Sequence, residues 1–258
     1  MKLNRRTAVK LGVGAAALVG MSGMMRAVAQ AQERTGDRYE TDNGEIVVYP
    51  IAHASLVLTV PGLVIYADPT GGADAYRGLP PADLILITHE HGDHFDPDTL
   101  KAITGEQTKL ITNPAVLEKL PEELKAKASP LGNGDATDVG NLKIEAIPAY
   151  NTTEDRKKFH PQGRDNGYVL SIDGSRVYIA GDTEDIPEMR ALKDIDIAFL
   201  PMNLPYTMDI DQASSAVAEF RPANVYPYHY QGADVEAFAA KVKEAAPDTK
   251  VILAKWYA

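Results

Sequence analysis

A dense cluster of polar residues directly after an apolar run constrains this chain more than any other feature of its sequence. Residues 83–88 are strongly apolar and β-branched, which predicts a buried strand, and His89, His91, Asp93 and His94 follow it. Side chains two apart at the end of an extended strand point the same way, so His89 and His91 are expected to face one point in space. The fold must therefore bring the end of this strand to other polar segments.

The residue types in this cluster predict a metal site. Three of the six histidines lie within it, and the chain has no cysteine, so imidazole and carboxylate groups must hold any metal ion. Asp93 and His94 are adjacent and suit a second ion beside the one that faces His89 and His91. This arrangement predicts two ions about 3.5–4 Å apart. The alternative is a solvated loop, which the concentration of ligand residue types disfavours.

Strand-like and helix-like segments alternate along the rest of the chain. Strands are predicted at residues 46–49, 55–60, 63–66, 83–88, 109–112, 142–148, 168–172, 176–180, 195–201, 224–228 and 250–253, and helices at 98–103, 115–120, 187–192, 212–220 and 235–245. The first three strands predict an antiparallel meander, and Asp211 and Asp234 are expected to cap the last two helices. The pattern predicts one α/β domain over residues 32–258, with two sheets and with helices outside them.

The first 31 residues differ sharply in composition from the rest of the chain. They hold five basic and no acidic residues, with Arg5 and Arg6 before an apolar run at residues 11–21 and small residues at 27–31. This pattern resembles a cleaved twin-arginine export signal, which implies a periplasmic or secreted protein. A membrane anchor is the alternative, but the apolar run is too short to span a bilayer. The net charge of −10 becomes more negative without this segment, which disfavours nucleic acid as a partner.

The His-x-His-x-Asp-His spacing over residues 89–94 resembles the signature of the metallo-β-lactamase superfamily. Asp182, in a Gly-Asp-Thr turn, and His229 each follow a strand candidate, in the order that the family shows. The resemblance implies a four-layer αββα sandwich of two mixed β-sheets with helices outside. It also implies that Asp182 bridges both metal ions and that His229 completes the shell of the second ion with Asp93 and His94.

Three further residues are candidates for the site. Residues 159–161 and 167–169 resemble the subgroup that contains L-ascorbate-6-phosphate lactonase, which implies that His160 is a ligand of the first ion. The alternative is a loop histidine at the mouth of the site, which would fit a single ion. Asp68 resembles an early family aspartate that orients a ligand histidine by accepting its other ring proton, and is otherwise a turn residue. His53 resembles a position near the metals but outside direct ligation, and is otherwise a core histidine.

The resemblance implies a hydrolase in which a metal-bound hydroxide attacks the substrate and Asp93 or Asp182 holds the proton. Zinc is the expected metal, while manganese and iron suit the same ligands. The expected substrate is a small molecule, first a lactone or a related small ester. A phosphodiesterase or phospholipase D-like hydrolase is the alternative, and a metal-binding protein without turnover is the alternative from another class.

Two features bear on the substrate. The long loop over residues 150–167 carries four basic residues that either favour an anionic substrate or form a solvated charged face, namely Arg156, Lys157, Lys158 and Arg164. Residues near the motifs either line the pocket or have packing roles, namely Tyr150, Asn151, Tyr206, Met208, Tyr228 and Tyr230. A serine nucleophile is disfavoured because the sequence has no Gly-x-Ser-x-Gly motif.

Overall fold

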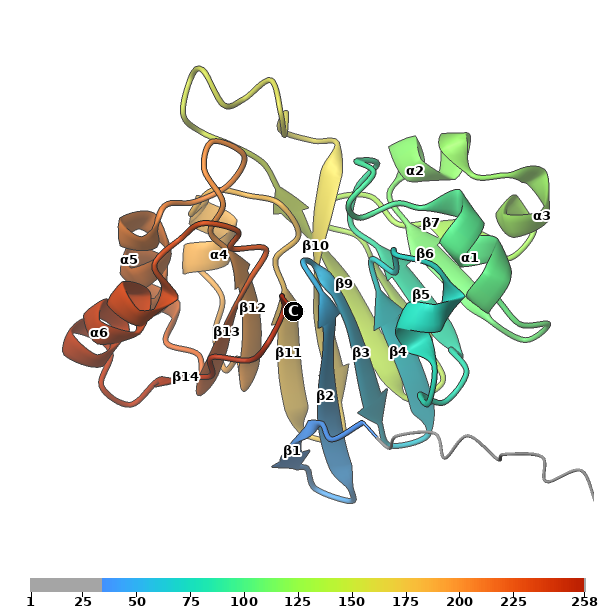
Figure 1. Ribbon diagram of the computed structural model, residues 1–258, viewed down its shortest axis with the longest axis horizontal. Helices are drawn as coiled ribbons and strands as arrows, with labels where there is room; N and C mark the ends of the chain where they lie inside the picture. Colours follow the sequence, from blue (N-terminus) through green and yellow to red (C-terminus); the bar gives the residue numbers. More distant parts are fainter. Residues whose placement is uncertain (1–33, 258) are drawn as a thin grey trace, which may run out of the picture. The chain divides into compact units, whose positions relative to one another are not determined.

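Two seven-stranded β-sheets lie face to face in the computed structural model, which describes residues 34–257 (Figure 1). Helices cover the outer face of each sheet, so the layers run helix, sheet, sheet, helix. The predicted sandwich of two mixed sheets is confirmed. The export signal predicted for residues 1–31 lies outside the described residues.

The first sheet comes from the first half of the described chain, and its strand order follows the sequence. Its strands are β1 (Asp37–Glu40), β2 (Glu45–Ala52), β3 (Ser55–Val60), β4 (Leu63–Ala67), β5 (Leu84–Ile87), β6 (Lys109–Thr112) and β7 (Ala128–Pro130). Strands β1 to β4 pair antiparallel, which includes the predicted meander, and β4 to β7 pair parallel. The parallel connections carry η1 (Ala73–Tyr76), α1 (Pro97–Ile103), α2 (Pro114–Lys119) and α3 (Glu122–Lys125).

The second sheet repeats this mixed arrangement. Its strands are β8 (Ala136–Val139), β9 (Leu142–Ala149), β10 (Asp165–Ile172), β11 (Ser175–Ile179), β12 (Ile197–Pro201), β13 (Asn224–Tyr228) and β14 (Lys250–Val251). Strands β8 to β11 pair antiparallel, and β11 to β14 pair parallel. The parallel connections carry α4 (Pro187–Arg190), α5 (Ile210–Phe220) and α6 (Val235–Ala245). Each parallel half therefore gathers the carboxyl ends of its strands at one edge.

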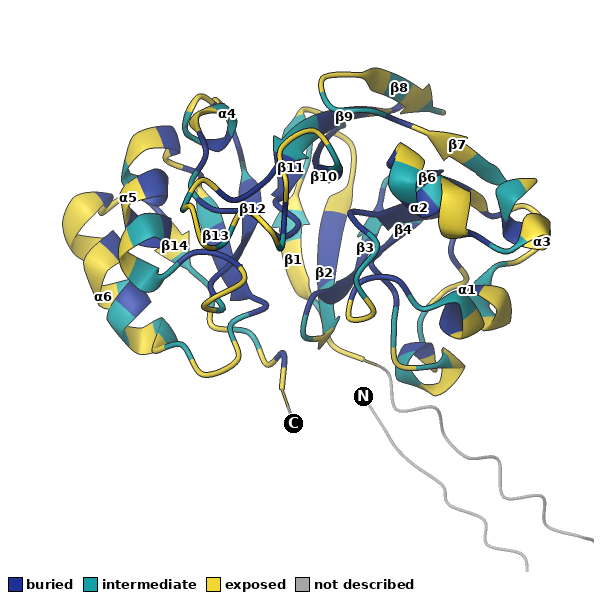
Figure 2. Cartoon of the chain, turned by 90° about the horizontal axis from the view of Figure 1, so that it is seen from above, coloured by how far each residue is buried: buried dark blue, intermediate teal, exposed yellow. Residues whose placement is uncertain are grey.

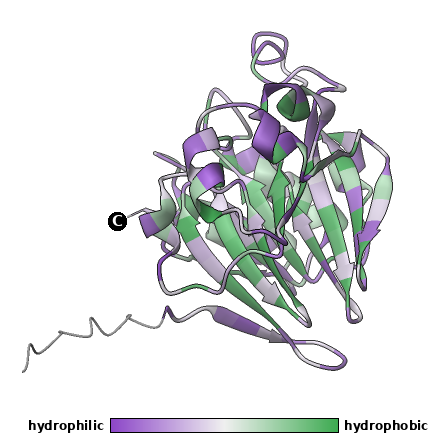
Figure 3. Ribbon diagram, turned by 90° about the vertical axis from the view of Figure 1, so that its right-hand side faces the viewer, coloured by the Kyte–Doolittle hydropathy of each residue, from purple (hydrophilic) through white to green (hydrophobic). Residues whose placement is uncertain are grey.

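Apolar side chains from both sheets fill the space between them. This central core includes Leu58, Ile144, Leu170 and Phe199, all of which are buried. Two further clusters lie under the helices, one beneath α1 to α3 and one beneath α4 to α6. Figure 2 shows buried strands with helices whose outer faces are exposed, and Figure 3 shows the matching apolar strands. Every residue of β5 is buried, as expected for a parallel strand covered on both faces.

Every predicted strand and helix corresponds to an observed element, but short elements were missed. Strands β1, β7 and β8 have three or four residues, none of them buried, so they carry little apolar pattern. The predicted cap of α5 at Asp211 is wrong, because Asp209 caps that helix and forms a reciprocal capping box with Gln212. Asp211 instead lies 2.8 Å from Lys241 as an ion pair. The predicted cap of α6 at Asp234 is confirmed.

None of the helices in the described range, residues 34–257, is both long enough and apolar enough to cross a membrane.

Candidate metal centre

The candidate site lies where the carboxyl ends of strands from both sheets meet. The structure brings together all the predicted ligands, which are His89, His91, Asp93 and His94 after β5, His160 before β10, Asp182 after β11 and His229 after β13. Parallel strands place the residues at their carboxyl ends along a shared edge, which is why segments distant in sequence converge here.

The carboxylate of Asp182 lies at the centre of this group and is buried. Its Oδ1 lies 3.2 Å from Nε2 of His94, and its Oδ2 lies 3.3 Å from Nε2 of His229. The same Oδ2 lies 3.4 Å from Nε2 of His160 and 3.8 Å from Nε2 of His89. Because a carboxylate has two oxygens, Asp182 is placed so that it could serve two cations.

Two sets of ligand atoms share Asp182, and the atoms of each set lie within 4.8 Å of one another. One set adds His89, His91 and His160, and the other adds His94 and His229. Among the described residues, Oδ1 of Asp182 and Nε2 of His89, His94 and His160 are buried without a hydrogen-bond partner. A buried polar atom without a partner destabilises the folded protein by about 1–3 kcal/mol, and a bound cation would remove this penalty. The donor set suits zinc, manganese or iron.

Asp93 lies on the open side of the site. Its Oδ2 is 3.3 Å from Nε2 of His229 and 3.2 Å from Nε2 of His53. Burial acts to raise the pKa of Asp93, but hydrogen bonds to His229 and His53 hold it well below its usual value. Asp93 is therefore a carboxylate at neutral pH, which can bind a cation or accept a proton.

The buried imidazoles and the central carboxylate also have shifted pKa values. Burial, followed by the neighbouring His94, lowers the pKa of His89 well below its usual value. Burial acts to lower the pKa of His94, but Asp182 and Asp68 outweigh it and raise that pKa. For Asp182, burial acts to raise the pKa, but His229 and His94 hold it well below the usual value. A cation at this site therefore competes with a proton on His94.

Asp68 contacts His94, one of the candidate ligands. It is fully buried after β4, and its Oδ2 accepts a hydrogen bond from Nδ1 of His94 at 2.8 Å. Its two oxygens also accept hydrogen bonds from the backbone N–H of Thr88 at 2.7 Å and from the Thr88 hydroxyl at 2.6 Å. Asp68 therefore fixes both the ring of His94 and the start of the histidine-rich turn.

His160 has a similar partner that the sequence analysis missed. Nδ1 of His160 donates to Oδ2 of Asp165 at 3.0 Å, and both side chains are buried. Arg164 donates to both oxygens of Asp165 at 2.6 and 2.9 Å. The imidazole of His160 is thus oriented with Nε2 toward Asp182. No spacing rule in the sequence marks Asp165, because its partner depends on how the loop folds.

A second missed residue, Glu184, anchors the loop that carries His160. Its carboxylate accepts hydrogen bonds from the backbone N–H groups of Thr152 and Thr153, both at 2.6 Å. It also accepts from both threonine hydroxyls, at 2.8 and 2.7 Å, and from Arg156 at 2.8 Å. Glu184 comes soon after β11, so it ties the loop to the same strand end that supplies Asp182.

Four residues at or beside this site have left-handed backbone conformations. His53, Asp68 and His229 have φ angles of 51°, 46° and 46°, which residues other than glycine seldom adopt. Gly181 has a φ of 65°, and an added Cβ would lie 2.7 Å from the carbonyl oxygen of Asn166. Strained residues of this kind persist where the surrounding structure holds them, often at functional sites.

The pocket at the site has a volume of about 430 Å³ and is lined by His53, His91, Asp93, Phe159, His160, Asp182, Asn203, Tyr206, His229 and Gln231. Asn203 and Gln231 were missed by the sequence analysis, because no motif marks them. Of the six predicted lining candidates, Tyr206 lines this pocket, whereas Met208 and Tyr228 are buried in the core.

The basic residues of the loop do not line the pocket. Arg156 pairs with Glu184 at 2.8 Å, and Lys157 pairs with Glu154 at 2.7 Å. Arg164 pairs with Asp165. Lys158 lies over the ring of Phe159, 5.0 Å from its centre. The charges of this loop therefore serve local contacts.

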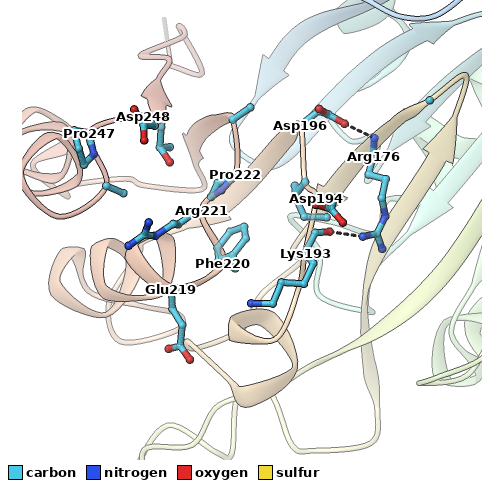
Figure 4. Close-up of a pocket in the computed structure, with 15 residues that line it drawn as sticks. Arg176, Lys193, Asp194, Asp196, Glu219, Phe220, Arg221, Pro222, Pro247 and Asp248 are labelled. Atoms are coloured by element: carbon cyan, nitrogen blue, oxygen red, sulfur yellow. Dashed lines mark hydrogen bonds between the residues drawn. The ribbon is translucent and has the colours of Figure 1, made fainter.

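A larger cleft of about 640 Å³ lies at the opposite edge of the second sheet, by the amino ends of its parallel strands (Figure 4). Its wall is formed by residues such as Arg176, Asp196 and Arg221, and no histidine is among the described residues that line it. The backbone N–H of Arg176 donates a hydrogen bond to the Asp196 carboxylate at 2.8 Å, and its guanidinium donates to the carbonyl oxygen of Lys193. The histidine cluster therefore marks the smaller pocket as the functional site.

Two mixed sheets, outer helices and an imidazole–carboxylate cluster at the shared edge are the architecture and candidate site of a metal-dependent hydrolase of the metallo-β-lactamase fold. Residues 48–229 match the family model described as Beta-lactamase superfamily domain. The chain belongs to the β-lactamase superfamily, which confirms the family resemblance drawn from the motifs.

Related proteins agree with this assignment. A solved structure from Parabacteroides distasonis, described as a metal-dependent hydrolase, is 47% identical with a TM-score of 0.77, and the match covers 84% of this chain and 97% of that chain. A metal-dependent hydrolase of Thermus thermophilus is 30% identical over 75% of this chain and 90% of its own length. Another, from Pyrococcus furiosus, is 33% identical over 67% of this chain and 78% of its own length.

Proposed function

We propose that this protein hydrolyses a small uncharged ester, with a lactone as the first candidate, and that it uses two divalent metal ions, with zinc as the first candidate. The observation that carries the proposal is the buried Asp182 carboxylate, which lies within 3.8 Å of four imidazole nitrogens. Two ligand sets that share one carboxylate support two adjacent ions better than a single ion.

The ligands divide between the two ions. We assign His89, His91, His160 and Asp182 to the first ion, and Asp93, His94, His229 and Asp182 to the second. The burial of His160 and its hydrogen bond to Asp165 support a ligand rather than a loop histidine at the mouth.

Divalent ions bound here would lower the pKa of a coordinated water toward neutrality and polarise a substrate carbonyl. The protein's own part is to hold the proton and to position the substrate. Asp182 and Asp93 are carboxylates at neutral pH that line the pocket. Either can accept the proton that water loses and return it to the departing alkoxide oxygen.

The lining of the pocket supports an uncharged substrate. Its volume of about 430 Å³ suits a small molecule. The aromatic rings of Phe159 and Tyr206, whose centres lie 4.9 Å apart, form one wall. The amides of Asn203 and Gln231 can donate to or accept from a neutral polar group. None of the described residues that line the pocket is lysine or arginine, so no side-chain cation there favours an anionic substrate.

A hydrolysis panel tests the proposal. Purified protein, loaded in turn with zinc, manganese and iron, is incubated with aliphatic lactones, aryl esters and a bis-aryl phosphodiester, and mass spectrometry identifies the products. We expect the lactone ring to open with addition of one water. Asp182→Asn should abolish turnover, while Asp138→Asn, which alters an exposed carboxylate on β8, should leave it unchanged.

Each outcome has a distinct meaning. Cleavage of the phosphodiester alone would replace the lactone proposal with the phosphodiesterase alternative. Metal binding without hydrolysis of any substrate would support a metal-binding protein without turnover. One ion per chain by elemental analysis, unchanged in His160→Ala, would refute the two-ion assignment.

We also propose that residues 1–31 direct export through the twin-arginine route, on the basis of Arg5, Arg6 and the short apolar run. Cell fractionation tests this. We expect wild-type protein outside the cytoplasm and a variant with both Arg5→Lys and Arg6→Lys inside it. Equal distribution of the two proteins would refute the proposal.

A further inference from the structure

His53 lies beside the proposed second ion but has no assigned role. It sits in the turn between β2 and β3, and its ring centre is 3.8 Å from that of His229. Its backbone is fixed by two hydrogen bonds, because its N–H donates to the carbonyl oxygen of Trp256 and its own carbonyl accepts from His229 N–H. With Asp93 and His229, it forms a group whose ligand atoms lie within 4.8 Å of one another. By distance alone, His53 could be a further metal ligand.

The partners of its two ring nitrogens point to a different role. Nε2 of His53 lies 3.2 Å from Oδ2 of Asp93, and an ionised carboxylate can only accept a hydrogen bond. Nδ1 lies 2.8 Å from the hydroxyl of Tyr257. That hydroxyl already accepts a hydrogen bond from the backbone N–H of Tyr230 at 3.1 Å, so its own hydrogen is free to point at Nδ1.

We propose that Tyr257 is a positioning residue that donates its hydroxyl hydrogen to Nδ1 of His53 and so holds His53 with its proton on Nε2. In this tautomer Nε2 has no lone pair for a metal ion. His53 then acts as a hydrogen-bond donor toward Asp93, on the open side of the pocket. This inference rests on the ligand set of the proposed function, and it explains why a nearby histidine is not part of that set.

The segment that carries Tyr257 is anchored firmly enough for this role. Trp256 is buried and packs edge-on against Phe199 and Tyr228, with ring centres 6.2 and 5.8 Å away. The ring of Tyr257 packs edge-on against Tyr230 at 4.9 Å. Burial raises the pKa of Tyr257 to about 12, so its hydroxyl keeps its hydrogen at neutral pH.

Nitrogen-15 NMR of the imidazole rings tests the tautomer directly, and six histidines make the spectrum tractable. Spectra are recorded for chelator-treated and zinc-loaded protein, and the His53 signals are identified by their loss in His53→Gln. We expect Nδ1 without a proton and Nε2 with one in both forms. Tyr257→Phe should move the Nδ1 signal toward that of a nitrogen without a hydrogen bond, and Tyr49→Phe, on β2, should not.

Two NMR results would overturn the proposal. One is a proton on Nδ1 with Nε2 bound to zinc, which would make His53 a ligand. The other is an unchanged Nδ1 signal in Tyr257→Phe. Zinc content gives an independent readout: His53→Gln should retain the wild-type number of ions per chain, whereas His229→Ala should lose one, and equal loss in both would also overturn it. Neither readout depends on hydrolysis, so failure of the proposed reaction would leave this test intact.

Discussion

Replacing Glu184 with glutamine should destabilise the protein in a pH-dependent way. The carboxylate is buried and accepts five hydrogen bonds from Thr152, Thr153 and Arg156. Burial acts to raise its pKa, but these hydrogen bonds, with those from Thr153 contributing most, lower it to about 2 from an ordinary value of 4.5. A glutamine would place an NH₂ group against donors that it cannot accept from.

The size of the effect comes from the two pKa values. Their difference corresponds to about 3 kcal/mol of stability for the ionised carboxylate. Because the pKa in the folded state is the lower one, this stability is fully present above pH 4.5 and is lost as the pH falls toward 2. About 1 kcal/mol of it should be gone at pH 4 and about 2 kcal/mol at pH 3.

Urea unfolding, followed by tryptophan fluorescence and circular dichroism, measures the effect. Free energies of unfolding are compared for wild type and Glu184→Gln between pH 7.5 and 3, with chelator present so that loss of metal does not contribute. We expect the free energy of unfolding of wild type to exceed that of Glu184→Gln by about 3 kcal/mol at pH 7. This difference should become smaller as the pH falls below 5. Glu118→Gln, which alters an exposed carboxylate on α2, should unfold with the same free energy as wild type. A difference in free energy of unfolding between wild type and Glu184→Gln that is the same at every pH would refute the electrostatic reasoning.

Three further predictions concern the site and its supports. Asp68→Asn should weaken metal binding about 10–100-fold, measured by competition with a chromophoric chelator, because His94 loses the carboxylate that orients it. Gly167→Ala should destabilise the fold by about 1–3 kcal/mol in urea unfolding, since its Cβ would lie 2.7 Å from the Ala180 carbonyl oxygen, and an unchanged midpoint would contradict this. Removing metal with chelator should lower the melting temperature, and adding zinc should restore it, because the buried ligand atoms otherwise lack partners.

The candidate ligands of the first cluster could be predicted from the sequence because their signal is local. His89, His91, Asp93 and His94 lie within six positions after an apolar strand, and the turn that follows β5 brings them together. Asp182 and His229 were predicted only with the help of the family resemblance, since a single aspartate or histidine after a strand is common. The structure places both beside the histidine-rich turn, because each follows a strand in the parallel half of the second sheet.

The partners of those residues could not be predicted in the same way. Asp165, which holds His160, and Glu184, which holds the loop around it, act through contacts that depend on the path of the loop. The same holds for Arg156 and Arg164, whose charges were candidates for substrate binding but are paired with these carboxylates. Charge in a sequence does not say which opposite charge will lie beside it.

The sequence by itself determined the alternation of strands and helices, the apolar strands of the two sheets and the histidine-rich turn, because each rests on patterns within a few residues. Only the tertiary structure decided that the ends of β5, β11 and β13 meet, that Asp182 lies among four imidazoles, and that Tyr257 contacts His53. Sheet pairing and packing of the shared core set these contacts between distant segments. These contacts depend on the free energy of folding of the whole domain, which no short stretch of residues determines.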